Sequence, residues 1–337
     1  MYPEERLAAG KEGSCKEGAS YWLPRIGSWL TILLAAVIFA WAYYAYVIVY
    51  CGLIWQDNAP RAATYGIVFH VLLCLCLWSY AATTLTWEAP IPAFYNLTVE
   101  EQQQLALCGT GYARKALLDQ LGIMRGVLTL DLDGSVRYCE PCRRIKPDRC
   151  HHCSVCCRCI PKMDHHCPWF SNCISFTTHK FFLLTLFYIV VLSTFCVTTT
   201  AGYLVKTAQT KNITGASLHI TIMVLGGASL SFTLGTFLCS HVGMVLRNET
   251  TLEGKRAPVF RNPHDSFDIG RYQNFVQVFG HEMILWLIPV FTSLGNGVQF
   301  PTRLCPGPCA AQFRPRSAVP ARSRSGSTSA LVLAELP

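Results

Sequence analysis

Four long apolar stretches dominate the pattern of hydrophobic and polar positions along the chain. They extend over residues 28–55, 64–87, 181–205 and 218–246, and none of them contains Lys, Arg, Asp or Glu. About 20 consecutive, mostly apolar residues suffice for a helix to cross a bilayer. A buried globular core is the alternative, but four uncharged stretches of this length disfavour it. We therefore predict an α-helical, polytopic membrane protein with four transmembrane helices.

Positive charge is distributed unevenly among the segments that connect these stretches. Lys and Arg number four in residues 1–27, eleven in 88–180 and ten in 247–337, against three in the two short loops. Positively charged loops are retained on the cytosolic side of a membrane. We therefore expect both termini and the segment between helices 2 and 3 to lie in the cytosol. The net charge of +8 suits a protein that lies against anionic lipid.

The segments also differ in composition. Beyond residue 301, Pro, Arg and Ser dominate, and such a sequence buries too little apolar surface to fold. No internal repeat is evident. The expected order is a cytosolic N-terminal tail (1–27), transmembrane helices 1 and 2 (28–87), a cytosolic cysteine-rich domain (88–180), transmembrane helices 3 and 4 (181–246), a cytosolic C-terminal packing segment (247–300) and a disordered tail (301–337).

Nine cysteines are concentrated between residues 139 and 173, together with a run of Asp, His, His and Cys at 164–167. Cysteines separated by two residues and joined by histidines at intermediate spacing are typical of tetrahedral zinc sites. The cytosol keeps thiols reduced, so metal binding is favoured over disulfide formation. Eight ligands suffice for two closed sites, and Cys167 then remains beside an imidazole and a carboxylate. A thiol in such surroundings is a candidate nucleophile.

The sequence over residues 138–182 resembles the Asp-His-His-Cys (DHHC) protein S-acyltransferases, the palmitoyltransferases. Supporting similarity is found in residues 145–153, in the Thr-Thr-Leu-Glu motif at 250–253 and in the spaced motif at 270–280. The resemblance implies a cytosolic, cysteine-rich double zinc-binding domain between transmembrane helices 2 and 3. It also implies an enzyme that moves a palmitoyl group from palmitoyl-CoA, through an acyl-Cys167 intermediate, to cysteines of substrate proteins.

The resemblance further implies two interleaved metal sites, each with three cysteines and one histidine. Each zinc ion would have four protein ligands, which leaves no open position for a substrate and indicates a structural role. Cys150, His151 and Cys157 lie in the same run but outside both sets. The ligands are Cys139, Cys142, His152 and Cys159 for one zinc ion, and Cys153, Cys156, His166 and Cys173 for the other.

Cys167 is the predicted nucleophile for acyl transfer. A free thiol with a pKa of about 8.5 is only slightly ionised at neutral pH, so it requires a base. His165 can accept its proton, and Asp164 can fix the imidazole tautomer and stabilise the resulting cation. His166 is excluded as the base because its lone pair would be bound to zinc.

Basic residues of the cysteine-rich segment are candidates for binding the phosphates of acyl-CoA. The alternative is a solvated face near anionic headgroups. The expected partners are long-chain acyl-CoA, the lipid bilayer and cytosolic or membrane proteins with juxtamembrane cysteines, and not nucleic acid. The expected location is an endomembrane, either the Golgi or the ER, or else the plasma membrane. The candidate basic residues are Arg143, Arg144, Lys146 and Arg149.

Three other functional classes fit parts of the pattern. A RING-type ubiquitin ligase also has interleaved zinc sites, but it ends in a closely spaced cysteine pair, whereas five residues separate Cys167 from Cys173. A nucleic-acid-binding zinc finger does not fit a location between transmembrane helices. A catalytically inactive scaffold remains a candidate because Ser175 and Thr178 stand where the resembling family usually has glycine and asparagine.

Overall fold

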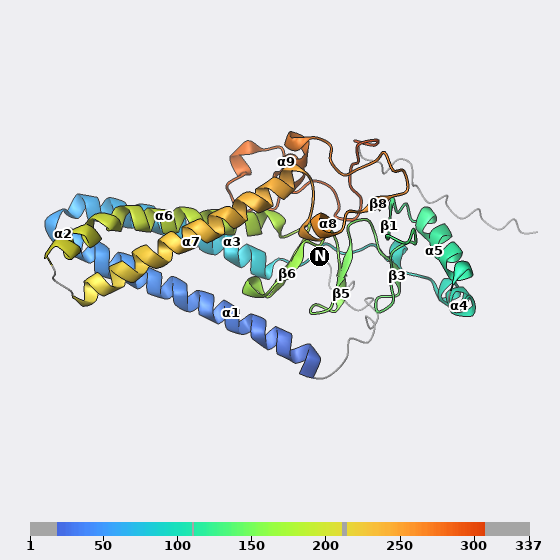
Figure 1. Ribbon diagram of the computed structural model, residues 1–337, viewed down its shortest axis with the longest axis horizontal. Coiled ribbons are helices and arrows are strands. Elements are labelled where there is room, and N and C mark those ends of the chain that lie inside the picture. Colours follow the sequence, from blue (N-terminus) through green and yellow to red (C-terminus); the bar gives the residue numbers. More distant parts are fainter. Residues whose placement is uncertain (1–18, 110, 211–213, 307–337) are drawn as a thin grey trace, which may run out of the picture.

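The computed structural model describes residues 19–109, 111–210 and 214–306. Figure 1 shows long helices gathered at one end of the molecule and short strands at the other. Within the described residues, the helical segments that are long and apolar enough to cross a membrane are Gly27–Asp57, Ala59–Leu85, His179–Thr210 and Gly215–Leu246. The prediction of four transmembrane helices, with the cysteine-rich segment between helices 2 and 3, is therefore confirmed.

Capping residues and polar contacts define the helices of the bundle. Asn58 caps the second span and Thr214 caps the fourth. The hydroxyl of Tyr46 in the first span is hydrogen-bonded to the hydroxyl of Thr199 in the third, and the hydroxyl of Tyr50 donates to the backbone oxygen of Thr199. The first span consists of α1 (Ala19–Tyr43), the π-helix η2 (Tyr44–Cys51) and α2 (Gly52–Asp57); the others are α3 (Ala59–Leu85), α6 (His179–Thr210) and α7 (Gly215–Leu246).

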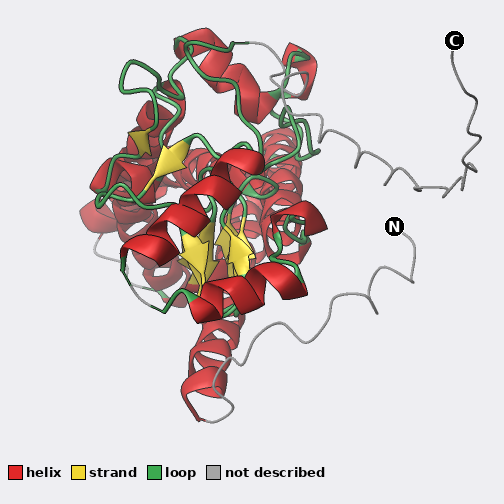
Figure 2. Ribbon diagram, turned by 90° about the vertical axis from the view of Figure 1, so that its right-hand side faces the viewer, coloured by secondary structure: helices red, strands yellow, loops and turns green. Residues whose placement is uncertain are grey.

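The cysteine-rich segment folds into short antiparallel hairpins joined by tight turns. Hairpins of so few residues are not stable alone, so other interactions must hold them. Figure 2 shows these strands, in yellow, among loops and flanked by helices. The hairpins are β2 (Tyr138–Cys139) with β3 (Arg144–Ile145), β4 (His151–Cys153) with β5 (Arg158–Ile160), and β6 (His165–Cys167) with β7 (Asn172–Ile174).

These hairpins form an internal repeat, so the expectation of no repeat is wrong. A period of 14 residues separates the equivalent strand pairs Cys139↔Arg144, Cys153↔Arg158 and Cys167↔Asn172. The turns share this period, because positive φ angles of 48°, 56° and 47° occur at Arg143, Cys157 and Ser171. The repeat lies in the backbone register and in the positions of Cys and His, while most other side chains differ between the units. That is why it is inconspicuous in the sequence.

Helices α4 and α5 pack against the first hairpin, and a further strand pair joins the hairpins to the chain after α7. α4 (Val99–Leu107) begins at a capping box formed by Thr98 and Glu101, and Glu101 pairs with the buried Arg125 at the end of α5 (Tyr112–Met124). The further pair is β1 (Thr129–Leu130) with β8 (Val259–Phe260). The remaining elements are η3 (Ala93–Tyr95), η4 (Pro168–Phe170), α8 (Thr251–Lys255), α9 (Arg271–Phe279) and η5 (Met283–Leu285).

The guanidinium group of Arg149 connects the hairpins to the residues that follow α7. It donates to both carboxylate oxygens of Glu253, at 2.8 and 2.6 Å. It also donates to the side-chain and backbone oxygens of Asn248, at 2.8 and 2.7 Å. The rings of Phe267 and Phe300 lie 4.6 and 5.2 Å from it. A buried charge is tolerated only when it is paired and hydrogen-bonded, so this arrangement fixes the chain after α7 against the hairpins.

The described chain extends beyond the boundaries expected for the two tails. α1 begins at Ala19, ahead of residue 28. Residues 301–306 are packed: Thr302 is fully buried, and the backbone N–H of Arg303 donates to the backbone oxygen of Ser266 at 2.8 Å. Residues 1–18 and 307–337, which include most of the tail expected to be disordered, lie outside the described residues.

We predict that Glu253→Gln destabilises the protein by about 3–5 kcal/mol, because it leaves the buried charge of Arg149 without its counter-ion. Thermal unfolding of the purified protein in detergent measures this change. Glu249→Gln is the matched control, since the Arg247–Glu249 pair is largely exposed and should contribute about 0–1 kcal/mol. Equal melting temperatures for the two variants would contradict the role assigned to Arg149.

Candidate active site and metal centres

The structure brings the eight predicted metal ligands together in two groups of three cysteines and one histidine. In each group, a Cys-x2-Cys turn faces a cross-strand His–Cys pair of the next hairpin. The hairpin β4–β5 therefore supplies ligands to both groups. The groups are Cys139, Cys142, His152 and Cys159, and Cys153, Cys156, His166 and Cys173.

Distances within both groups fit a tetrahedral metal ion. The Nδ1 atom of His152 lies 3.4 and 3.3 Å from the sulfur atoms of Cys139 and Cys142. The Nδ1 atom of His166 lies 3.7, 3.4 and 3.6 Å from the three sulfur atoms of its group. A tetrahedral ion with metal–sulfur and metal–nitrogen bonds of about 2.3 and 2.0 Å places nitrogen and sulfur about 3.5 Å apart. Each group can therefore hold a metal ion with four protein ligands.

Asp164, His165 and Cys167 lie on or next to β6, the first strand of the last hairpin. The Nδ1 atom of His165 is 2.6 Å from Oδ2 of Asp164. Asp164 and Cys167 are buried, whereas the side chain of His165 is 28% exposed. The structure thus places the three predicted catalytic residues together. His166, between them in sequence, belongs to a metal group instead.

Thr251 holds the carboxylate of Asp164 in place, a role that the sequence interpretation did not assign. Its backbone N–H donates to Oδ1 and its hydroxyl donates to Oδ2, both at 2.7 Å. Thr251 begins α8, which starts here because Thr250 and Glu253 form a capping box. The Thr-Thr-Leu-Glu motif had marked this segment as part of the family resemblance. The partner of Thr251 could not be read from the motif because 87 residues separate it from Asp164.

Hydrogen bonds within this group determine its protonation. Burial raises the pKa of the Asp164 carboxyl, but hydrogen bonds from His165 and Thr251 outweigh burial and hold it well below its usual range. Burial likewise lowers the pKa of His165, but its interactions with Asp164 and Cys167 raise it to about 9. At neutral pH an imidazole with this pKa holds a proton, and the resulting positive charge stabilises the thiolate form of a neighbouring cysteine.

The hairpin β6–β7 is attached to the end of α3. The side-chain amide of Asn172 donates to the backbone oxygens of Thr83 and Thr86, at 3.0 and 2.9 Å. The hydroxyl of Tyr80 donates to the backbone oxygen of Trp169 at 2.6 Å. The bonds from Asn172 satisfy carbonyl groups at the end of α3 that have no partner within the helix. Together with the bond from Tyr80 to Trp169, they fix the position of the hairpin on the bundle.

Apolar side chains of α6 surround Cys167 on the side of the bundle. Cys167 belongs to a buried cluster that includes Phe182, Leu183 and Leu186. On α1, the hydroxyl of Thr31 donates to the backbone oxygen of Pro168, the residue that follows Cys167. The thiol therefore lies where the transmembrane bundle meets the hairpins.

The departures at Ser175 and Thr178 form a locally hydrogen-bonded turn at the start of α6. The hydroxyl of Thr178 accepts from the backbone N–H of Ser175 at 2.9 Å and donates to the backbone oxygen of Cys173 at 2.8 Å. Both side chains are buried. The turn that leads from the metal ligand Cys173 into α6 is therefore well satisfied with these two residues.

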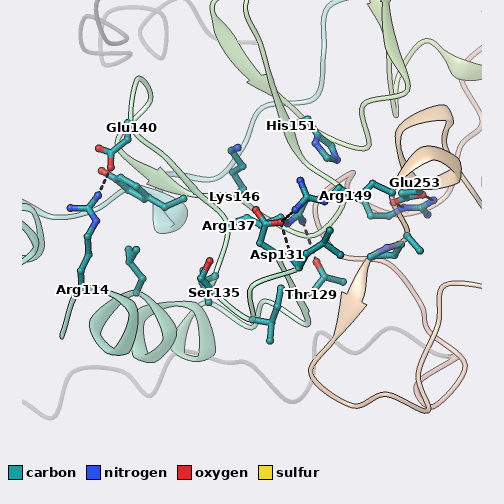
Figure 3. A pocket seen from close by; sticks show the side chains of 18 residues that line it. Arg114, Thr129, Asp131, Ser135, Arg137, Glu140, Lys146, Arg149, His151 and Glu253 are labelled. Atoms are coloured by element: carbon teal, nitrogen blue, oxygen red, sulfur yellow. Dashed lines mark hydrogen bonds and ion pairs between the residues drawn. The ribbon is translucent and has the colours of Figure 1, made fainter. Parts of the chain in front are cut away.

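Lys146 and Arg149, two of the four residues expected to bind phosphate, line a cavity of about 390 Å³ in the cysteine-rich part of the protein (Figure 3). Arg143 and Arg144 are not among its lining residues. The expectation for Arg149 is wrong, because its guanidinium group is buried and bonded to Glu253. Of the four, Lys146 alone combines a place in the cavity with a side chain that is not fully buried.

Of the charged residues that line the cavity, Arg114, Arg149 and Arg256 are paired with Glu140, Glu253 and Asp131, so its excess positive charge comes from Arg137 and Lys146. Burial and the positive charges of Arg137 and Lys146 lower the pKa of His151, which also lines the cavity, to about 4. Glu253 of α8 lines it too, and Thr251, two residues earlier, binds Asp164. The same short helix therefore contacts both the cavity and the Asp164–His165–Cys167 group.

Comparison with known proteins identifies the family. The model of the DHHC palmitoyltransferase domain matches residues 133–257. Palmitoyltransferase ZDHHC2 of Homo sapiens is 37% identical over 284 residues, which cover 83% of this chain and 77% of that protein. Palmitoyltransferase ZDHHC20-B of Danio rerio is 34% identical over 281 residues, 82% of this chain and 84% of that protein. The resemblance noted in the sequence is confirmed, and the chain belongs to the DHHC family of protein palmitoyltransferases.

Proposed function

We propose that Cys167 carries the acyl group in the protein S-palmitoylation that this family catalyses. The observation that supports this role is the sequence of contacts from Thr251 to Asp164 and from Asp164 to His165, with Cys167 next to His165. An ordered base beside a thiol is what nucleophilic catalysis by cysteine requires. The intact ligand groups and the satisfied turn at Ser175 and Thr178 favour an active enzyme over an inactive scaffold.

The proposed reaction consists of two thioester exchanges. His165 accepts the proton of Cys167, and the thiolate attacks the carbonyl carbon of palmitoyl-CoA. The bond to the CoA sulfur breaks, CoA leaves as a thiol with the proton from His165, and acyl-Cys167 remains. A cysteine thiol of the substrate protein then gives its proton to His165 and attacks the acyl group, which restores Cys167. Asp164 stabilises the imidazolium form of His165 in both steps.

We further propose that both ligand groups bind Zn²⁺. Three thiolates and one imidazole in tetrahedral arrangement suit zinc better than magnesium or calcium, which prefer oxygen ligands. With four protein ligands each, the ions would be structural. They would stabilise hairpins that are too small to fold on their own, and the chemistry would remain with Cys167 and His165.

Acyl-CoA is the proposed acyl donor, and its phosphates are assigned to the cavity that Lys146 lines. The cavity carries positive charge and is lined in part by α8. Thr251 of the same helix binds Asp164, so α8 connects the cavity to the group that contains Cys167. The apolar cluster around Cys167 is suited to the start of the acyl chain. For Arg143 and Arg144, which do not line the cavity, we propose the alternative role stated above: a solvated face near anionic lipid headgroups.

The uneven distribution of Lys and Arg supports a topology in which the cysteine-rich domain and both termini face the cytosol. The proposed location is a Golgi or ER membrane, or the plasma membrane. The proposed acceptors are cytosolic or membrane proteins whose cysteines lie close to the bilayer, because Cys167 lies at the end of the bundle. The domain division given above is proposed with two boundaries moved, because α1 begins at Ala19 and the packed chain after α7 continues beyond residue 301.

Replacing the nucleophile should remove activity without removing metal. Cys167→Ser is expected to abolish autoacylation from labelled palmitoyl-CoA while retaining both metal equivalents and an unchanged melting temperature. Hydroxylamine-sensitive label and metal content of the purified protein measure the two properties. Cys239→Ser, which removes an exposed thiol of α7, is the control and should remain fully acylated. Loss of a metal equivalent in Cys167→Ser would show that the ligand assignment is incorrect.

The two adjacent histidines should have different effects. His166→Ala is expected to lose one metal equivalent and to unfold at lower temperature, because structural metal sites contribute folding energy directly. His165→Ala should retain both equivalents and lose roughly 10²–10⁴ in the rate of autoacylation, the contribution of a general base. Metal analysis and single-turnover kinetics of both variants decide the matter. Metal loss from His165→Ala with retention in His166→Ala would reverse the roles.

Removing the cavity lysine should weaken binding of the donor more than it slows the chemistry. Lys146→Ala is expected to raise KM for palmitoyl-CoA about tenfold with little change in kcat, since a hydrogen bond to a charged group contributes roughly 1.5 kcal/mol. Arg143→Ala removes an exposed charge outside the cavity and is the matched control. An equal rise in KM for both variants would indicate general attraction by surface charge instead of a site.

A further inference from the structure

A third cluster of metal-binding side chains lies directly behind the catalytic group. It consists of Asp164, His179 and His241, whose ligand atoms all lie within 4.8 Å of one another. Asp164 precedes β6, His179 is the first residue of α6, and His241 is in α7. Their exposed fractions are only 1%, 4% and 3%. Three elements distant in sequence thus bring two imidazoles to one buried carboxylate.

Both imidazoles present a nitrogen atom that has nothing to bind. Nε2 of His179 and Nδ1 of His241 are buried and have no hydrogen-bond partner in the part of the chain that the structure describes. Leaving a buried polar atom unpaired costs about 1–3 kcal/mol, and native proteins rarely do so. Two unpaired imidazole nitrogens, in residues that lie beside the same carboxylate, point to a ligand that completes the cluster.

The donor set identifies the chemistry of that ligand. Two imidazoles and one carboxylate form a typical three-ligand zinc site with an open fourth position. Two cations lie near the cluster: Arg149 is paired with Glu253, and the buried Lys162 acts on His179 but is itself opposed by the charges of Asp164 and Glu253. The rings of His241 and His165 lie 6.1 Å apart, so the cluster adjoins the partly exposed side chain of His165.

We propose that Asp164, His179 and His241 form a third zinc site, which slows acyl transfer when it is occupied. A cation bound to Asp164 competes for the carboxylate that orients His165. It also opposes the positive charge that His165 gains when it takes the proton of Cys167. The inhibition rests on the function proposed above for Asp164, whereas the binding of the ion does not. The site would make the enzyme sensitive to free Zn²⁺.

Metal binding is tested on the full-length protein in detergent, with Cys167→Ser as the background so that the nucleophile cannot bind the ion. Titration with Zn²⁺ should reveal a third equivalent, weaker than the two structural ones. Co²⁺ added to the zinc-loaded protein should give d–d absorption without a thiolate-to-cobalt charge-transfer band, since the site contains no sulfur. A charge-transfer band, or no third equivalent, would overturn the proposal.

Matched variants locate the third equivalent. His179→Phe and His241→Phe should each lose it and keep the two structural equivalents, which also verifies that the protein is folded. His219→Phe removes a histidine near the other end of α7 and should retain all three. A third equivalent that persists in both cluster variants would place the ion elsewhere and would refute the assignment.

Inhibition is measured as autoacylation at buffered concentrations of free Zn²⁺, relative to the rate of each variant without added metal. His179→Phe should raise the inhibitory concentration by at least the roughly 10–100-fold that loss of a supporting contact to a bound metal costs. An unchanged inhibition curve would refute a regulatory role for the cluster. Failure of the function proposed above is recognised separately, as autoacylation that survives Cys167→Ser.

Discussion

A charged guanidinium group with no access to water, that of Arg149, constrains how the parts of this protein fit together. Its hydrogen bonds require Glu253 and Asn248 from the chain that follows α7, and the rings of Phe267 and Phe300 lie against it. Because these partners are in place, α8 begins where Thr251 reaches Asp164. The orientation of Asp164, and with it that of His165, therefore depends on an ion pair that lies outside the Asp164–His165–Cys167 group. For this reason the chain after α7 helps to position the proposed active site.

The metal groups impose a second constraint, because they are linked in series. The hairpin β4–β5 contributes His152 and Cys159 to one group and Cys153 and Cys156 to the other. Neither group can lose its ligands without disturbing the other, so the segment from residue 139 to 173 has to fold as one unit. The last hairpin of that unit contains Cys167, the proposed nucleophile, and is bonded to the end of α3. When both metal groups are formed, the hairpin that contains Cys167 is therefore also held in place.

The sequence was sufficient where the signal is local or very specific. Apolar stretches without charge predicted the four helices, and the spacing of Cys and His, with the family resemblance, predicted both ligand groups. It was insufficient where the partner is distant. The burial of Arg149 depends on Glu253, which follows 104 residues later, and the cluster of His179 and His241 depends on how α6 and α7 meet. Spacing along the chain carries no information about such pairings.

The 14-residue repeat places two proposed metal ligands and the proposed nucleophile at equivalent positions. Cys139, Cys153 and Cys167 occupy the same position in successive hairpins, with the same strand register and the same turn conformation. The first two are completed by a second cysteine, a histidine and a third cysteine, whereas Phe170, Lys180 and Phe187 stand at the corresponding positions after Cys167. The local fold is therefore the same for all three thiols. The unit of Cys167 lacks the other three donors that complete a metal site in the first two units. We therefore attribute the proposed reactivity of Cys167 to this loss, which leaves its thiol to interact with His165.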